Sequence, residues 1–366
     1  MTEKVLAATT TGRRTTELRE YPAPEIPPDA GLLRIEAAGV CGTDWQTYNQ
    51  DKPARIMGHE NVGRIYKIGP IAAARWGLKE GDRVALEEYL PCGHCGFCRS
   101  GEFRLCEATE ARRPGAMRYG TTPITQPPAL WGGFSQYQYL HPNSVFHRVP
   151  DNVPAELLAM CLPVGNGIQW MCFDGGAGPG KSVLIQGPGQ QGLACAAAAK
   201  TAGADLVIVS GLDRDQHRLE IARKMGADHV IFAEREDVVG RTLELTAGRG
   251  VDISLDAAGG PNTLVLAIRA AKKNGKVLFA AAPATMAPEF NVNDLLAKRL
   301  TLRPCRGHSF ESVELAIQNI VSRKFPYQLM ATHRFGLADV DLAIRSLGGE
   351  GAPGAIHVTV IPWEAA

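Results

Sequence analysis

The sequence lacks three features that would place it at a membrane or on a nucleic acid. No apolar run approaches the roughly 18 residues of a membrane span. Lys and Arg (39) nearly balance Asp and Glu (38), and a net charge of +1 argues against binding to nucleic acid or anionic membranes through overall charge. The start, Met1-Thr2-Glu3-Lys4, has no basic region followed by an apolar one, so we expect a cytoplasmic protein without a signal peptide.

The 366 residues are 45% hydrophobic and 21% charged, which excludes a largely disordered chain and predicts two domains. Nine cysteines form an odd set, and without a signal peptide they indicate reduced thiols rather than a disulfide framework. Cys41 stands alone upstream, and four others are scattered at positions 161, 172, 195 and 305. The remaining four lie close together, at Cys92, Cys95, Cys98 and Cys106.

The two parts of the chain differ in their hydrophobic patterns. Short β-like runs separated by Gly and Pro fill the first 150 residues and predict an irregular antiparallel β domain. From about Pro154, buried-type strands alternate with helix-period stretches, which predicts a parallel sheet with helices on both faces. We expect those strands at 182–185, 206–209, 229–232, 253–255 and 276–279. Helices near 309–323 and 337–347 and a strand at 356–361 follow.

A glycine motif follows the first of these strands and opens a helix. In this position Gly187 permits a tight turn, Gly189 lets backbone amides approach a pyrophosphate, and Gly192 lets the helix pack on the strand. Gln190 lies within the same motif and is a further candidate for cofactor binding, and the helix-forming residues begin at Leu193. The sequence therefore predicts a dinucleotide site.

Cofactor preference depends on the end of the next strand, where Gly211 occupies the position at which an acid usually binds the ribose hydroxyls. Asp213 lies two residues later and could do the same, while repelling a 2′-phosphate. Arg214 or Arg218 could instead attract that phosphate. The pattern favours NAD, with NADP as the alternative.

The clustered cysteines have the spacing C-x2-C-x2-C-x7-C. Four thiolates can enclose a tetrahedral zinc and leave no open position, which predicts a structural zinc in a lobe at about residues 88–110. A second candidate metal site combines Cys41 with His59 and Glu60, and Asp44 could orient His59 through its other ring nitrogen.

Together these motifs resemble the zinc-dependent medium-chain dehydrogenase/reductase family of alcohol and polyol dehydrogenases, across essentially the whole chain. The resemblance is carried by Gly39-Val40-Cys41-Gly42-Thr43-Asp44, Gly58-His59-Glu60-Asn61-Val62-Gly63, Gly81-Asp82-Arg83-Val84, the four-cysteine lobe, Gly132-Gly133-Phe134-Ser135-Gln136-Tyr137, the glycine motif and Thr332-His333-Arg334-Phe335.

This resemblance implies an α/β protein of two domains. A GroES-like catalytic domain, a partly closed β-barrel, would comprise residues 1–155 and 305–366. A doubly wound Rossmann domain would comprise residues 156–304. The resemblance also implies a homodimer or homotetramer that acts on a small-molecule alcohol or ketone, without nucleic-acid or membrane partners.

The resemblance further implies roles for individual residues. Cys41 and His59 would bind a catalytic zinc, with Glu60 a ligand or a near neighbour, and Thr43 would pass the substrate proton away. Zinc acting as a Lewis acid would favour an alkoxide, which helps to expel hydride to the nicotinamide. The expected activity is oxidation of a secondary or cyclic alcohol to a ketone, or the reverse.

Two departures from the family pattern concern the catalytic centre. Asn166 stands where most relatives have a cysteine ligand, and Leu162 stands where others have a glutamate, so the metal would rely on Cys41, His59, Glu60 and water. Gln46 replaces a histidine that ends the proton relay in some relatives. We also expect Trp45 and Asn166 to line the substrate pocket.

The sequence leaves two alternative functions open. The weakened ligand set is compatible with NADPH-dependent reduction of an activated C=C bond without catalytic zinc. The arginines around the cysteine lobe would suit a zinc ribbon that binds nucleic acid, although acidic residues dilute their charge. The arginines concerned are Arg99, Arg104, Arg112, Arg113 and Arg118.

Overall fold

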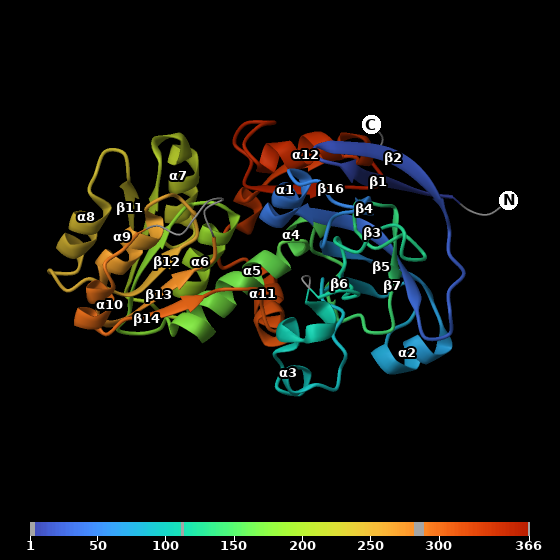
Figure 1. Cartoon of the computed structure of the whole chain (residues 1–366), viewed down its shortest axis with the longest axis horizontal. Coiled ribbons are helices and arrows are strands. Elements are labelled where there is room, and N and C mark those ends of the chain that lie inside the picture. The colour runs from blue at the N-terminus through green and yellow to red at the C-terminus, as the bar shows by residue number, and fades with distance from the viewer. Residues whose placement is uncertain (1–3, 111–112, 282–288, 365–366) are drawn as a thin grey trace. The chain divides into compact units, whose positions relative to one another are not determined.

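The computed structural model describes residues 4–110, 113–281 and 289–364, and the chain divides into two compact units (Figure 1). The first unit contains Met1–Leu162 and Ala331–Ala366, and the second contains Pro163–Met330. Among the described residues, no helix has both the length and the apolar character needed to cross a membrane.

The first unit is a mainly antiparallel β structure around one apolar core, as the sequence predicts. One sheet has the order β15-β16-β3-β5-β6-β8, with β7 also paired to β3, and a smaller sheet has the order β2-β1-β4. Fully buried residues such as Leu33, Ile35, Val84 and Phe134 belong to the core. The strands are β1 (Lys4–Gly12), β2 (Thr15–Pro22), β3 (Gly31–Val40), β4 (Arg55–Ile56), β5 (Glu60–Ile68), β6 (Arg83–Leu86), β7 (Tyr137–Leu140), β8 (Phe146–Arg148), β15 (Ala331–Phe335) and β16 (His357–Val360).

Short helices lie between these strands, and one of them starts directly after the central strand β3. The chain leaves β3 at Val40 and enters α1 one residue later, so Cys41 sits at the junction. The helices of this unit are α1 (Gly42–Tyr48), α2 (Pro70–Trp76), α3 (Gly96–Arg99), α4 (Ala155–Leu158) and α12 (Val340–Leu347), with 3-10 turns at Phe103–Leu105, Glu107–Thr109 and Leu337–Asp339.

The second unit is a six-stranded sheet in which every pairing is parallel. The strand order is β11-β10-β9-β12-β13-β14. The strands are β9 (Ser182–Gln186), β10 (Leu206–Gly211), β11 (His229–Phe232), β12 (Val251–Asp256), β13 (Ala271–Phe279) and β14 (Thr301–Pro304). The helices are α5 (Cys161–Ile168), which starts at the unit boundary, α6 (Gln190–Thr201), α7 (Gln216–Lys224), α8 (Val238–Leu245), α9 (Thr263–Ala270), α10 (Val292–Lys298) and α11 (Phe310–Ser322), with a π-helical segment at Gln169–Gly175 and 3-10 turns at Asp213–Asp215 and Tyr327–Leu329.

This strand order is that of a doubly wound dinucleotide-binding fold. The chain runs outward from β9 to β11, returns to the other side of β9, and runs outward again to β14. Because parallel crossovers are right-handed, reversing the direction of winding puts the helices on opposite faces of the sheet. The predicted α/β class is therefore confirmed, and the switch of direction lies beside the glycine motif that follows β9.

The unit boundaries differ from those expected at 155/156 and 304/305. Helix α4 packs on β3 and β5 and so stays with the first unit. The segment after residue 304 stays with the second unit, because the Cys305 N–H donates to the Phe279 carbonyl (2.8 Å) and the Trp170 indole donates to the Gly307 carbonyl (3.1 Å). The return to the first unit comes only at Ala331.

A buried arginine at the start of β6, Arg83, connects three segments of the first unit. The Arg83 guanidinium, 6% exposed, donates to Glu36 (2.7 Å) on β3 and to the carbonyls of Pro150 (2.7 Å) and Val153 (2.8 Å). It therefore ties two strands to the segment that precedes α4.

We expect Arg83→Ala to lower the free energy of unfolding by about 3–5 kcal/mol, because it leaves the Glu36 carboxylate without its most buried partner. Arg148→Ala is the matched control: its ion pair with Asp82 is exposed, so the change should stay within about 1 kcal/mol. Urea unfolding followed by circular dichroism measures both. Equal losses in the two variants would contradict a special role for Arg83.

Candidate metal and dinucleotide sites

The first candidate site begins where β3 passes into α1. Cys41 is the residue before the helix and has an extended backbone. Its N–H donates to a carboxylate oxygen of Asp44 (2.9 Å), and the Asp44 N–H donates back to the Cys41 carbonyl (3.0 Å). This reciprocal pair satisfies amides at the start of the helix and fixes the Cys41 backbone relative to Asp44.

His59 and Glu60 come from the start of β5, directly after a turn at Gly58. Gly58 has a φ of +87°, and the ring of Phe134 lies 2.6 Å from the position that a Gly58 Cβ would take, so only glycine fits. The turn brings the His59 ring between two groups of α1. Its Nδ1 is 3.4 Å from the Asp44 carboxylate, and its Nε2 is 3.3 Å from the Thr43 hydroxyl.

These elements bring three potential metal ligands together. One ligand atom from each of Cys41, His59 and Glu60 lies within 4.8 Å of the others. His59 and Glu60 are buried, Cys41 is partly buried, and Thr43 is exposed. The cluster is thus enclosed on the protein side and accessible beside Thr43.

The electrostatics of this cluster fit a cation. Burial, and then the charge of Glu60, raises the pKa of the Cys41 thiol. Burial also raises the pKa of Glu60 to about 7. For His59, burial lowers the pKa, but Asp44 and Cys41 outweigh it and leave the value well above the ordinary one. A divalent cation would compensate this buried negative charge.

The donor set also fits zinc. A thiolate, an imidazole and a carboxylate are the ligand types that zinc takes in proteins, and three protein ligands leave a position open for a further molecule. One carboxylate oxygen of Glu60, Oε2, is buried and has no hydrogen-bond partner among the described residues. With Asp44 at Nδ1, the Nε2 of His59 is left to face a metal.

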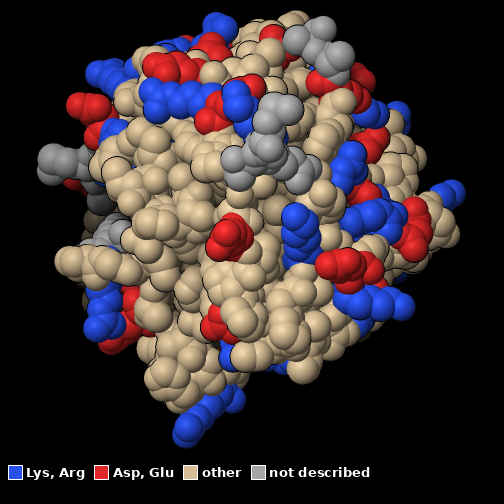
Figure 2. Space-filling model, turned by 90° about the vertical axis from the view of Figure 1, so that its right-hand side faces the viewer, with Lys and Arg blue, Asp and Glu red and all other residues tan. Residues whose placement is uncertain are grey.

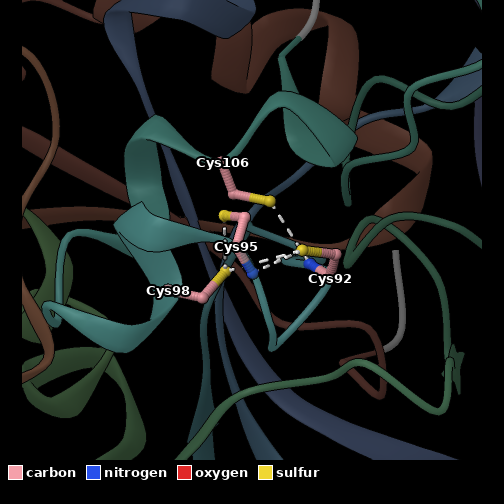
Figure 3. A group of neighbouring side chains, drawn as sticks. All are labelled: Cys92, Cys95, Cys98 and Cys106. Carbon is pink, nitrogen blue, oxygen red and sulfur yellow. Dashed lines mark hydrogen bonds between the residues drawn. The ribbon is translucent and has the colours of Figure 1, made fainter.

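The second candidate metal site is the cysteine lobe (Figure 3). Figure 3 shows the side chains of Cys92, Cys95, Cys98 and Cys106 directed toward one another, and their sulfur atoms all lie within 4.8 Å. Backbone amides support the sulfurs: the Cys95 N–H donates to Cys92 Sγ (3.4 Å) and the Cys92 N–H donates to Cys106 Sγ (3.3 Å). Four thiol ligands with no further position form a closed, structural type of site.

Without a bound metal, two thiols of the lobe have pKa values shifted in opposite directions. The backbone amides of His94 and Cys95 lower the pKa of Cys92 to about 6, whereas burial and the Cys95 thiol raise the pKa of Cys98 to about 12. A bound cation would allow all four to be thiolates, because each ligand must lose its proton.

The predicted dinucleotide motif has the geometry that its three glycines require. Gly187 has a φ of +100°, Gly189 has open space around its missing side chain, and a Cβ on Gly192 would lie 1.9 Å from the Gly187 carbonyl oxygen. The glycines thus allow the turn and the close contact between helix and strand, and they leave open space at Gly189, where a pyrophosphate is predicted to bind. Gln190 is the first residue of α6, so the helix begins three residues before Leu193, where the helix-forming run was expected.

The residues expected to set cofactor preference surround the end of β10. A Cβ on Gly211 would lie 2.8 Å from Pro188 Cγ, so no acidic side chain fits there. Asp213 pairs with Arg235 (2.8 Å), and its N–H donates to Glu234 (2.7 Å).

The two arginines near this position differ in their contacts. Arg218 pairs with Asp215 (3.2 Å), whereas Arg214 is exposed and none of the described residues pairs with it. Both an acidic and a basic group therefore stand at the strand end, and the choice between NAD and NADP stays a prediction.

The two residues expected to line the substrate pocket have other contacts within their own units. The Trp45 ring packs against Gly348 and lies 5.3 Å from the Arg14 guanidinium carbon. The Asn166 amide oxygen is 3.0 Å from His308 Nδ1, a partner that the sequence did not reveal. Gln46 is exposed on α1. The predicted part of Trp45 and Asn166 in substrate binding remains a prediction.

The structure links three further side chains to the Cys41 cluster, a role that the sequence did not predict for any of them. Glu88 acts on the cluster by charge, raising the pKa of both His59 and Glu60. Arg118 pairs with Glu88, and its guanidinium lies 4.7 Å from the centre of the Tyr89 ring. The third is His357 of β16, whose Cε1 approaches Gly39. None of these residues belongs to a motif, so only their spatial position identifies them.

The charges on one face of the molecule and around the lobe are mixed in sign. On the face shown in Figure 2, Lys and Arg are interspersed with Asp and Glu. Around the lobe, Arg104, Arg113 and Arg118 pair with Glu102, Glu107 and Glu88. Arg112 lies outside the described residues.

The fold and these two kinds of site are those of a zinc-type dehydrogenase, and comparison with known proteins agrees. Residues 27–151 match the alcohol dehydrogenase GroES-like domain, and residues 192–322 match the zinc-binding dehydrogenase domain. The chain is 36% identical to a probable alcohol dehydrogenase of Mycobacterium tuberculosis over 354 residues, covering 94% of this chain and 95% of that protein.

Other relatives extend the comparison. The L-threonine 3-dehydrogenase of Pyrococcus horikoshii is 33% identical over 330 residues, covering 87% of this chain and 88% of that protein. The crystal structure of an alcohol dehydrogenase from Thermotoga maritima superposes with a TM-score of 0.85 at 26% identity, covering 98% and 100% of the two chains. The chain belongs to the zinc-dependent medium-chain dehydrogenase/reductase family, and it is an oxidoreductase of the NAD(P)-dependent, zinc-type class.

We expect Cys98→Ser to remove one zinc per chain, because a closed tetrahedral site needs all four thiolates. Cys172→Ser is the control, since Cys172 lies outside both clusters and should leave the zinc count unchanged. Elemental analysis of purified protein measures the count. A Cys98→Ser protein that retains its full zinc complement would contradict the assignment of the lobe.

We expect Asp213→Asn to weaken NAD⁺ binding about tenfold or more while sparing NADP⁺, because a charged acceptor for the ribose hydroxyls is lost. Glu220→Gln, at an exposed position of α7, is the control. Calorimetric titration gives both dissociation constants. Unchanged NAD⁺ binding, together with weaker NADP⁺ binding in Arg214→Ser, would instead assign the site to NADP.

Proposed function

We propose that this chain interconverts a secondary or cyclic alcohol and its ketone, using zinc at the Cys41 centre and NAD(P). The observation that carries this proposal is the convergence of Cys41, His59 and Glu60 beside an exposed hydroxyl, that of Thr43. Zinc would supply Lewis acidity toward the substrate oxygen, and the nicotinamide would supply the hydride acceptor or donor.

The chain's own residues support the proton chemistry that such a reaction needs. Thr43 is exposed at the cluster, and its hydroxyl can accept a proton from a substrate oxygen while donating its own onward. His59 is held in place by Asp44 at Nδ1, so its ring cannot turn away from the cluster. His59 and Glu60 are buried, which limits the access of water to the cluster from the protein side.

The substrate class rests on the relatives. One acts on the C3 hydroxyl of threonine, by its name, and another is a sorbitol dehydrogenase of Bacillus subtilis, 32% identical over 79% of this chain. The C3 hydroxyl of threonine is a secondary alcohol. A polar secondary alcohol is therefore the first substrate class to test.

The alternative is NADPH-dependent reduction of an activated C=C bond on the same fold. Such a reaction would not need the thiol, imidazole and carboxylate of the Cys41 cluster, nor the contact of Thr43 with His59. The geometry of the cluster therefore favours the alcohol reaction.

The decisive test is a panel of secondary alcohols, ketones and enones with each nicotinamide cofactor, followed at 340 nm. We expect turnover with alcohols or ketones in wild type and a loss of at least about a hundredfold in Cys41→Ser, since the metal supplies several kcal/mol of charge stabilisation. The same variant should lose one zinc per chain and keep the lobe zinc. Full activity with lobe zinc alone, or turnover confined to enones, would overturn the proposal.

A further inference from the structure

We propose that His357 positions the carboxylate of Glu60 at the Cys41 centre, through a gap that Gly39 leaves open between them. The inference rests on the proposed function, since it requires Glu60 to be a permanent ligand of the zinc at that centre. It concerns a residue at the far end of the chain, on β16, that belongs to none of the motifs of the sequence.

The gap arises from strand register. In the seven-stranded sheet, β3 lies between β16 and β5, and Gly39 is opposite Glu60 on one side and Thr359 on the other. His357 is the first residue of β16, on the side of β3 away from Glu60. A side chain on β3 at this point would separate His357 from Glu60.

Gly39 removes that separation. A Cβ at Gly39 would lie 2.6 Å from Glu60 Oε2 and 2.9 Å from His357 Cε1, closer than real Cβ atoms approach other atoms. The carboxylate and the ring therefore face each other across the space of the missing side chain. The backbone of Gly39 does not have the positive φ that demands glycine, so the requirement is one of space.

The oxygen that faces this gap is the same Oε2 that has no hydrogen-bond partner among the described residues. A buried carboxylate oxygen without a partner is costly, so its position needs a compensating interaction. A cation held by the ligand cluster would provide one. His357 is fully buried and forms the wall behind the carboxylate, and burial keeps its imidazole neutral, with a pKa lowered to about 3.

The position of His357 bears on how many protein ligands the metal at the Cys41 centre would have. By the family resemblance, Asn166 and Leu162 stand at the two positions where a third protein ligand would be expected, and neither side chain is a good zinc ligand. With the His357 ring behind it, Glu60 cannot retract from the cluster toward β16. His357 is thus a positioning residue that keeps Glu60 as the third protein ligand.

The test measures zinc affinity at the Cys41 centre by chelator competition on the purified full-length chain, in three variants. His357→Ala removes the wall, Gly39→Ala fills the gap, and His357→Gln keeps a polar group of similar size. Changing a residue that orients a metal ligand typically costs 10–100-fold in metal affinity. We expect a loss of about that size in the first two variants and less than about threefold in His357→Gln.

Two further measurements separate this role from a general structural one. Replacement of the zinc by cobalt should give a visible d–d spectrum that shifts in His357→Ala, since the coordination by Glu60 changes. The lobe zinc should stay at one per chain in every variant, which shows that the first unit is folded. Gly12→Ala is the matched control, because nothing lies within 4 Å of a Cβ at that position on β1.

The outcomes distinguish this inference from the proposed function. Wild-type affinity and an unchanged cobalt spectrum in both His357→Ala and Gly39→Ala, with weaker binding in Glu60→Gln, would overturn the role of His357 and leave the metal centre in place. Two zincs per chain in Cys41→Ser and in Glu60→Gln would overturn the metal centre itself.

Discussion

The buried carboxylate of Asp44 connects the elements on which the candidate metal centre depends. One of its oxygens accepts the N–H of Cys41 at the start of α1, and the other faces Nδ1 of His59 at the start of β5. A single side chain therefore fixes a potential thiolate ligand and a potential imidazole ligand that are 18 positions apart in the sequence. This double contact is possible because α1 begins directly after β3, the neighbour of β5 in the sheet.

The same arrangement concentrates negative charge in a poorly hydrated place. Asp44, Glu60 and the thiol of Cys41 are close together, and Glu88 adds to their effect on His59. Burial of ionised groups is expensive unless they are paired or bind a cation. The ion pair with Arg118 compensates the negative charge of Glu88. A bound cation would compensate the negative charge of the ligand cluster. In the cysteine lobe, four neighbouring thiolates would likewise need a bound cation to compensate their negative charge.

Much of the fold could be predicted, because its signals are local. Five strands of the second unit, β9 to β13, overlap the predicted runs, since short apolar runs between helix-period stretches indicate burial on both faces of a sheet. Strand β13 begins earlier than its predicted run, and β14 was not predicted. The chain returns to the first unit at Ala331, after the domain boundary expected at 304/305, and the contacts of Cys305 and Gly307 keep the intervening segment with the second unit. Such contacts leave no periodic trace in the sequence.

The sequence by itself determined the fold class, the cysteine lobe, the glycine motif and the identity of three ligand candidates, because each depends on residue type at short, fixed spacing. Only the tertiary structure decided that Asp44 also accepts the Cys41 N–H, that Asp213 is paired with Arg235, and that His357 approaches Glu60 across Gly39. Strand register and side-chain direction set these contacts. They join residues as much as 297 positions apart, as between Glu60 and His357, and sequence spacing carries no information at that range.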